Sequence, residues 1–233
     1  KTYDIKIIDN FLDIDDFNEI NSIKLLKIDS NEIKVYHNSI SKNNVILSES
    51  LSHNLILKIH KKYHTKIFKI LKDISPEKAK LYDYTDLVLI ETGANYKYPI
   101  HDDTPNKLLS GVIYLSPESN SGTIFYNSRQ GENRTEIDWK TNRAVFFSRR
   151  EKETWHSYEG DMKNNRVALV YNLMTTQVKE VFEVEKKNYF IGNLRWKLSP
   201  HIYKYFKNSV RNRLTLVVVV SLSYRSLTSA CPM

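Results

Sequence analysis

The sequence predicts a mainly β protein with flanking helices, of the α+β class. After Lys80, short apolar segments alternate with turn residues, and six or more of them have the length and spacing of strands. Before Lys80, one long stretch carries apolar residues at helical spacing. Short strands at this spacing are typical of a sandwich, a jelly roll or a barrel, and no internal repeat indicates another architecture.

Length and composition favour one folded domain. The chain has 233 residues, 41% of them hydrophobic and 27% charged, and only six glycines and six prolines, which argues against a disordered or loop-only chain. We expect a single domain over 1–233. Residues 1–79 form an N-terminal support of helix and strand, 80–175 form the β core, and 176–233 form a C-terminal extension.

The formal net charge is +8, and a basic balance can attract anionic partners. The lysines are spread along the chain rather than gathered in one block, and the aromatic residues fall mostly at core-like positions. We therefore expect a solvated basic surface, a field that favours an anionic substrate or co-substrate, and no nucleic-acid partner.

Cysteine usage and hydropathy point to a cytoplasmic protein. Cys231 is the one cysteine, which excludes a disulfide framework and a cysteine-based zinc site. Residues 1–10 are too polar for a signal peptide. The apolar run Leu214–Leu222 is far shorter than the roughly 20 residues of a membrane helix.

The N-terminal third contains two predicted helices and two predicted strands. Thr2–Ile8 alternates polar and apolar residues like a strand, and Lys34–Tyr36 is a second, shorter one. A helix capped by Asn10 or Asp13 is expected through Ile23, and the clearest helix of the chain is expected over 48–74.

Two histidines of the long predicted helix, His60 and His64, are four residues apart and share one face. That spacing suits a metal, but no glutamate follows His60 and lysines surround the pair. We expect a solvated helix face.

The core is predicted to be a series of short strands. They are Asp86–Ile90, Leu108–Leu115, Gly122–Tyr126, Thr135–Trp139, Arg143–Ser148 and Arg166–Met174. After Thr175 the pattern weakens. A short helix over 198–210 and an accessory strand with a tail over 214–233 are expected, without an assigned role.

Three residues suggest a metal centre. His101 and Asp103 are two residues apart, so on an extended segment both side chains point to one face. His156, at a turn after the segment 144–147, can supply a third ligand. Two histidines and one carboxylate form the facial set of non-haem Fe(II) oxygenases, with positions left open for substrate and oxygen. The alternative is an ordinary His-x-Asp loop, and Asp102 is the rival carboxylate.

Arg166 suggests a carboxylate-binding position. It begins the apolar strand Arg166–Met174 and shares a face with Ala168 and Val170. A guanidinium that points toward a core needs an anionic partner, because an unpaired buried charge costs several kcal/mol. A bound dicarboxylate supplies one through a bidentate pair.

In this order, the motifs resemble the iron(II)- and 2-oxoglutarate-dependent dioxygenases, in particular the small bacterial and phage members of the prolyl-4-hydroxylase-like branch. His101-x-Asp103, His156 and Arg166 carry the resemblance. Tyr98, the strand 112–115 and the turn and strand 121–125 add to it. The resemblance covers about 86–174.

The resemblance implies a double-stranded β-helix, the jelly-roll or cupin-like core. It implies Fe(II) on His101, Asp103 and His156, with O₂ as oxidant and ascorbate as an auxiliary reductant. The far carboxylate of 2-oxoglutarate is expected on Arg166, and the residues expected to assist in binding this co-substrate are Tyr114, Thr123 and Tyr98.

The implied reaction is hydroxylation of a C–H bond in a peptide or small molecule, with release of succinate and CO₂. Halogenating members of the family lack the carboxylate ligand, whereas Asp103 is present here. Three departures from the pattern leave the substrate open: Gly93 stands eight residues before His101, Ser121 replaces a glycine, and Arg166 replaces the lysine of collagen-type members.

The alternative class is a cupin-like jelly roll without oxygenase activity, which binds a metal or a sugar. Such sites usually carry an additional glutamate and more histidines near the first strand pair, and none occurs between Lys107 and Glu118 except Glu118 itself. Near His156, we expect Trp155 and Tyr158 to be packing or rim residues, and Arg149 and Arg150 to be a solvated pair.

Overall fold

The computed structural model describes residues 4–202, with side chains through 197. The chain divides into two compact units, and the fold and the candidate site lie in the first, Lys1–Trp196. No helix within the described range is long and apolar enough to cross a membrane.

Eleven strands and five helices make up the described residues. The strands are β1 (Ile5–Ile8), β2 (Ile33–Ser41), β3 (Ile46–Ser48), β4 (Tyr84–Thr92), β5 (Lys97–His101), β6 (Lys107–Ser116), β7 (Ile124–Tyr126), β8 (Thr135–Glu136), β9 (Ala144–Phe147), β10 (Trp155–Glu159) and β11 (Arg166–Met174). The helices are α1 (Ile14–Asn21), α2 (His53–Ile74), α3 (Pro76–Ala79), α4 (Val178–Val184) and α5 (Tyr189–Ile202).

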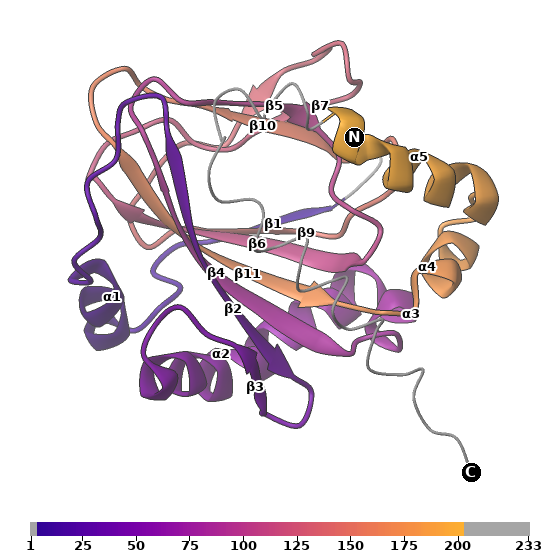
Figure 1. The fold of residues 1–233 in the computed structure, drawn as a ribbon, viewed down its shortest axis with the longest axis horizontal. Helices are drawn as coiled ribbons and strands as arrows, with labels where there is room; N and C mark the ends of the chain where they lie inside the picture. Colours follow the sequence, from indigo (N-terminus) through magenta and orange to yellow (C-terminus); the bar gives the residue numbers. More distant parts are fainter. Residues whose placement is uncertain (1–3, 203–233) are drawn as a thin grey trace. The chain divides into compact units, whose positions relative to one another are not determined.

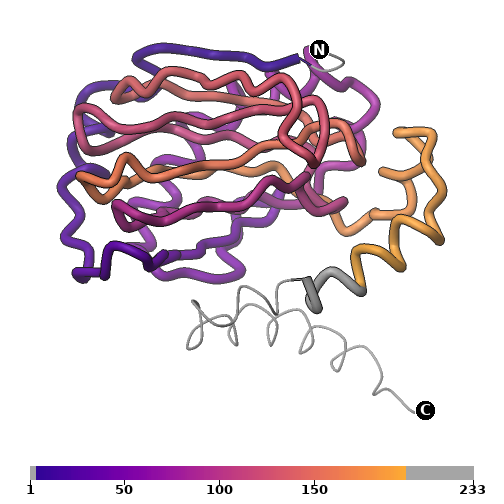
Figure 2. Tube along the Cα trace, turned by 90° about the horizontal axis from the view of Figure 1, so that it is seen from above, coloured from indigo at the N-terminus to yellow at the C-terminus, as the bar shows by residue number. Residues whose placement is uncertain are grey.

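The strands form two antiparallel sheets. The larger sheet has the order β1-β9-β6-β11-β4-β2-β3, and the smaller has the order β5-β10-β7-β8. Figure 1 shows the smaller sheet on one side of the larger sheet, with α1 and α2 on the other side. Figure 2 shows the strands lying side by side along their length. The larger sheet therefore has a helix-covered outer face and an inner face that looks toward the smaller sheet.

Strand alternation assigns the residues of the larger sheet to these two faces. On β11, Leu169, Tyr171 and Leu173 belong to the main hydrophobic core, which also contains the apolar side of α2. The residues between them, together with Arg166, point to the inner face. A second, smaller cluster lies between the sheets and is made of Tyr114, Phe125, Ile137, Val145 and Phe147.

Most of the predicted elements are present, and their bounds differ by a few residues. The last strand, Arg166–Met174, has the predicted bounds, and the long helix begins at His53 rather than at residue 48. The prediction that His156 lies at a turn is wrong, because it is the second residue of β10. Two helices were missed or misplaced, α4 and α5. The parts of the predicted tail helix and tail strand beyond residue 202 lie outside the described residues.

The prediction of a solvated face for His60 and His64 is also wrong. His60 is 1% exposed. The hydroxyl of Tyr171 lies 2.7 Å from His60 Nδ1 and 3.4 Å from His64 Nδ1. The pair is a polar contact between α2 and β11 inside the main core, because the i, i+4 spacing turns both imidazoles toward the sheet.

Burial of His60 predicts an acid-sensitive fold. Burial and the neighbouring His64 lower the pKa of His60 from 6.5 to about 4. Below pH 6.5 the unfolded chain binds a proton that the folded chain does not bind until about pH 4. The free energy of unfolding therefore falls as the pH falls through this window, by at most about 1.4 kcal/mol per pH unit from this group.

The change that tests this is His60→Gln, which keeps a hydrogen-bonding group beside Tyr171 but does not titrate. Urea unfolding between pH 4 and 7 is expected to show a shallower loss of stability in the variant than in the wild type. Parallel pH dependences in the two proteins would contradict the assignment.

Candidate metal centre and adjoining arginine site

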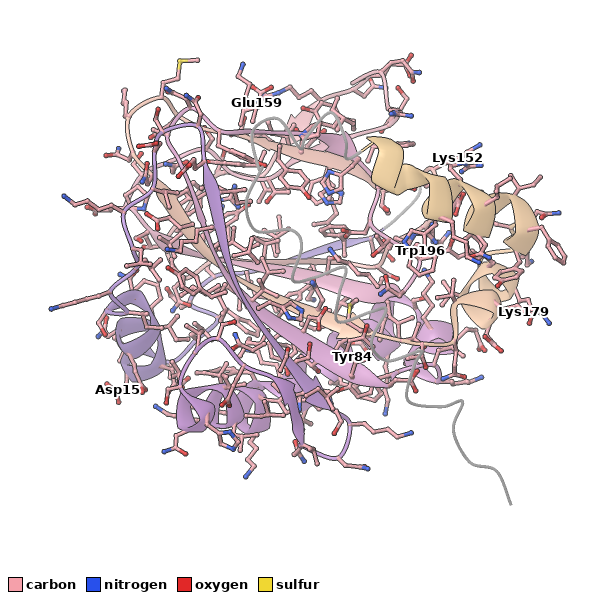
Figure 3. The ribbon with its side chains drawn as sticks, in the orientation of Figure 1. Asp15, Tyr84, Lys152, Glu159, Lys179 and Trp196 are labelled. Atoms are coloured by element: carbon pink, nitrogen blue, oxygen red, sulfur yellow. The ribbon has the colours of Figure 1, made fainter. Side chains whose placement is uncertain are left out.

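Two imidazoles meet because β5 and β10 pair in antiparallel register. His101 ends β5 and lies directly opposite His156 on β10, and their ring centroids are 4.2 Å apart. Phe147 packs against the His156 ring with centroids 4.8 Å apart. A cross-strand pair and an aromatic neighbour thus hold the two rings together near one end of the smaller sheet. Figure 3 labels Lys152, which precedes β10, and Glu159, which ends it, both in the upper part of the view.

Both imidazoles are oriented by the backbone. His101 Nδ1 lies 2.9 Å from the carbonyl oxygen of Pro99, and His156 Nδ1 lies 2.9 Å from that of Thr154. A carbonyl accepts only a donated proton, so each Nδ1 carries the hydrogen and each Nε2 presents a lone pair. Burial and the neighbouring His156 lower the pKa of His101 from 6.5 to about 3, which keeps this ring neutral at pH 7.

Asp103 completes the group. It is 6% exposed, and its Oδ2 lies 3.9 Å from His156 Nε2. Lys107 Nζ donates to Oδ1 at 2.6 Å and Ser110 Oγ donates to Oδ2 at 2.5 Å. Burial alone would raise the pKa of Asp103, but the ion pair with Lys107, together with the nearby His156 and His101, outweighs it and lowers that pKa far below 3.8. The carboxylate is therefore charged and fixed.

One ligand atom from each of His101, Asp103 and His156 lies within 4.8 Å of the others, and among the described residues this is the group that could hold a metal ion. Asp102 points elsewhere, since its Oδ2 accepts the backbone N–H of Lys152 at 2.9 Å. Two neutral imidazole nitrogens and one carboxylate oxygen fit a divalent transition metal with positions left open.

Arg149 belongs to a buried ionic network behind this group, so the prediction of a solvated arginine is wrong. It is 2% exposed and donates to the Asp103 carbonyl oxygen at 3.1 Å. Its guanidinium also donates to Glu185 and Glu151, each at 2.7 Å. Lys78, also buried, donates to the other oxygen of Glu185 at 2.7 Å. The network ties the loop that carries Asp103 to α3 and to the residue after α4.

Arg166 lies in an aromatic cage that includes Tyr158, which follows His156 by two residues on β10. It is 7% exposed, and its guanidinium carbon lies 3.9 Å from the ring centroid of Tyr158, 5.2 Å from that of Trp139 and 5.4 Å from that of Tyr114. No carboxylate of the described residues forms an ion pair with it. Burial lowers the pKa of Arg166 below 12.5, because it disfavours the charged guanidinium. A bound anion would offset this desolvation cost.

The structure places the other predicted site residues around these two positions. The Tyr98 ring lies 4.6 Å from the ring of His101. The Tyr114 hydroxyl donates to Thr123 Oγ1 at 2.9 Å and accepts the Thr123 N–H at 2.8 Å. Tyr114 and Thr123 therefore form one buried unit beside Arg166, and Tyr98 lies beside the metal group.

Sequence reasoning missed Lys107 and Ser110, which hold Asp103, and the Trp139 wall of the cage. Trp139 stacks on Tyr114 with ring centroids 4.5 Å apart. The position of Lys107 four residues after Asp103 is a signal that could have indicated the ion pair. Trp139 gave no such signal, because its contact with Arg166 depends on the fold.

No protein-family model matches the sequence, and no curated protein matches it. Solved structures do resemble the fold. An oxidoreductase of the 2OG-Fe(II) oxygenase family from Burkholderia pseudomallei is 13% identical, with a TM-score of 0.53 over 73% of this chain and 84% of that one. IDO from Bacillus thuringiensis is 10% identical, with a TM-score of 0.51 over 74% and 90%. The expectation of a jelly-roll core is thereby confirmed.

A prolyl-4-hydroxylase from Pseudomonas putida is 11% identical, with a TM-score of 0.48 over 75% of this chain and 94% of that one. A likeness this distant does not decide the branch, which stays a prediction.

The neighbouring aspartates offer a matched test of the metal group. Asp103→Asn is expected to weaken Co(II) binding by more than about 10-fold, because it removes a charged ligand, and loss of an outer-shell partner alone costs that much or more. Asp102→Asn makes the same chemical change one residue away and is expected to leave Co(II) affinity unchanged. Calorimetric titration of both variants measures this, and an equal loss in both would contradict the assignment.

Proposed function

We propose that this chain is an Fe(II)- and 2-oxoglutarate-dependent dioxygenase that hydroxylates a C–H bond of a small molecule or peptide. The observation that carries the proposal is the pairing of two chemically different positions inside one jelly roll. One is the His101, Asp103 and His156 group, and the other is the buried Arg166, which no carboxylate of the described residues neutralises. A metal ion and a dicarboxylate are the ligands that satisfy both.

The residues fit these groups. Nε2 of His101, Nε2 of His156 and a carboxylate oxygen of Asp103 would hold Fe(II) in the facial arrangement of non-haem iron oxygenases. The Arg166 guanidinium would pair with the far carboxylate of 2-oxoglutarate, and the hydroxyl groups of Tyr114 and Thr123 beside it would assist. The aromatic rings around Arg166 exclude water, which strengthens the ion pair.

When bound, iron and 2-oxoglutarate supply the oxidising chemistry: one O₂ is consumed, 2-oxoglutarate becomes succinate and CO₂, and the substrate C–H becomes C–OH. The protein supplies position. Pro99 and Thr154 fix the imidazole tautomers, Lys107 and Ser110 keep Asp103 ionised and oriented, and Tyr98 lies against His101.

The solved structures with a TM-score above 0.5 support the proposal through the fold, and one of them carries the name of the 2OG-Fe(II) oxygenase family. The cupin-like alternative, a jelly roll that binds a metal or a sugar without oxygenase activity, would leave Arg166 without a role.

Addition of Fe(II) and 2-oxoglutarate under anaerobic conditions is expected to give a weak visible charge-transfer band. His156→Ala is expected to abolish the band, because it removes one of three protein ligands. Absorbance difference spectra measure this, and an unchanged band in the variant would sink the metal assignment.

The co-substrate position is tested separately by Arg166→Ala. Loss of the guanidinium is expected to raise the Kd for 2-oxoglutarate by about 10-fold or more, as expected for lost charge-assisted hydrogen bonds. Arg134→Ala, at a surface ion pair with Glu136, is the control and should leave the Kd unchanged. An unchanged Kd in Arg166→Ala would favour the cupin-like alternative.

A further inference from the structure

A row of polar residues crosses the larger sheet at one level of the register. Ser39 on β2 lies opposite Asp86 on β4, Asp86 lies opposite Asn172 on β11, and Asn172 lies opposite Ser110 on β6. Ser110 is the residue whose hydroxyl donates to Asp103. The row therefore leads from the edge region of the sheet to the candidate metal group.

The row lies on the inner face of the sheet. Asn172 has the same parity on β11 as Arg166, and its neighbours Tyr171 and Leu173 belong to the helix-covered core. Likewise Leu87, next to Asp86, belongs to that core. The side chains of the row thus point toward the space between the two sheets.

The inner face is less covered than the outer one. Leu89, Leu169 and Tyr171 on the outer face are at most 1% exposed. On the inner face, Val112 and Val170, at the next level of the register, are only partly buried. Side chains at this level of the inner face are therefore more accessible than those of the outer face.

Asn172 and Asp86 carry the acceptor oxygens at the centre of the row. Asn172 is 4% exposed, and its Oδ1 is buried without a hydrogen-bond partner among the described residues. A buried acceptor without a donor is costly unless a ligand supplies one. Asp86 Oδ1 accepts a hydrogen bond from Ser39 Oγ at 2.7 Å and lies 3.2 Å from His37 Nε2. Neither contact involves Oδ2.

The row is separate from the proposed 2-oxoglutarate position. Asn172 follows Arg166 by six residues on one strand, and six residues of β-strand span about 20 Å. A dicarboxylate with a five-carbon chain does not reach from Arg166 to the row. The two sites therefore lie at opposite ends of β11, and the metal-ligand support Ser110 stands at the level of the row.

We propose that Asp86 and Asn172 form the substrate-recognition site and that the substrate presents a protonated primary amine to them, an inference that rests on the proposed oxygenase function. A carboxylate and an amide oxygen on adjacent strands are acceptors for an ammonium group, which donates up to three hydrogen bonds. Asp86 and Ser110 are two strand spacings apart, roughly 10 Å. The oxidised carbon therefore lies several bonds from the amine.

The test is a set of diamines and free amino acids, each paired with its N-acetylated form. Calorimetric titration in the presence of Co(II) and 2-oxoglutarate measures binding without turnover. We expect one or more amines to bind at least about 10-fold more tightly than their acetylated forms. We expect the same amines, with Fe(II) and O₂, to increase succinate formation.

Asp86→Asn and Asn172→Leu are each expected to remove this preference by about 10-fold to 100-fold, the effect of a lost hydrogen bond to a charged group. Glu159→Gln makes the same charge change as Asp86→Asn at an exposed position, the end of β10, and should keep the preference. If Asp86→Asn does not fold, Asn172→Leu alone tests the inference.

Equal binding of amines and acetylated forms, no amine binding across the set, or an unchanged preference in Asp86→Asn and Asn172→Leu overturns the inference. The proposed oxygenase function fails on a different result, the absence of the charge-transfer band in the wild-type protein. An intact band with no amine preference therefore rejects the substrate class alone.

Discussion

The antiparallel pairing of β5 with β10 is the constraint on which the candidate site depends. It sets His101 directly opposite His156. No local motif in the sequence could fix this pairing. Because both Nδ1 atoms face backbone carbonyls, the same pairing also decides which nitrogens are available. A shift of one residue in this register would turn one imidazole to the outside of the sheet.

Asp103 brings a negative charge into this buried position, and the surrounding charges are arranged to tolerate it. Lys107 pairs with its side chain, while Arg149 holds its backbone carbonyl and is itself neutralised by Glu151 and Glu185. The desolvation cost of these buried charges is offset only if each has a partner of opposite charge. Arg166 forms no ion pair with any described residue, and an external anion is the natural explanation for its buried charge.

The sequence predicted the strands whose inner and outer residues are apolar. Arg166–Met174 is the clearest example, because apolar side chains face both the helices and the barrel interior. It did not predict β10, since the inward positions of that strand carry His156 and Tyr158 rather than apolar residues. Polar and aromatic side chains interrupt the hydrophobic pattern there, and the usual signal of a strand is lost.

The spacing His101-x-Asp103 and the downstream His156 predicted three residues whose ligand atoms lie within 4.8 Å of one another. The partners of buried charges were not predictable, because they come from distant segments. Glu185 lies 36 residues after Arg149, and Tyr171 lies 111 residues after His60. The inner-face row of Asp86 and Asn172 likewise exists only once the register of four strands is known.

We expect the jelly roll to bind a metal at His101, Asp103 and His156 and a dicarboxylate at Arg166 at the same time. Anomalous diffraction from crystals soaked anaerobically with Fe(II) and 2-oxoglutarate tests it most directly. We predict one iron peak bonded by Nε2 of His101, Nε2 of His156 and a carboxylate oxygen of Asp103, with the far carboxylate of 2-oxoglutarate on Arg166. Iron at other residues, or 2-oxoglutarate bound away from Arg166, would contradict it.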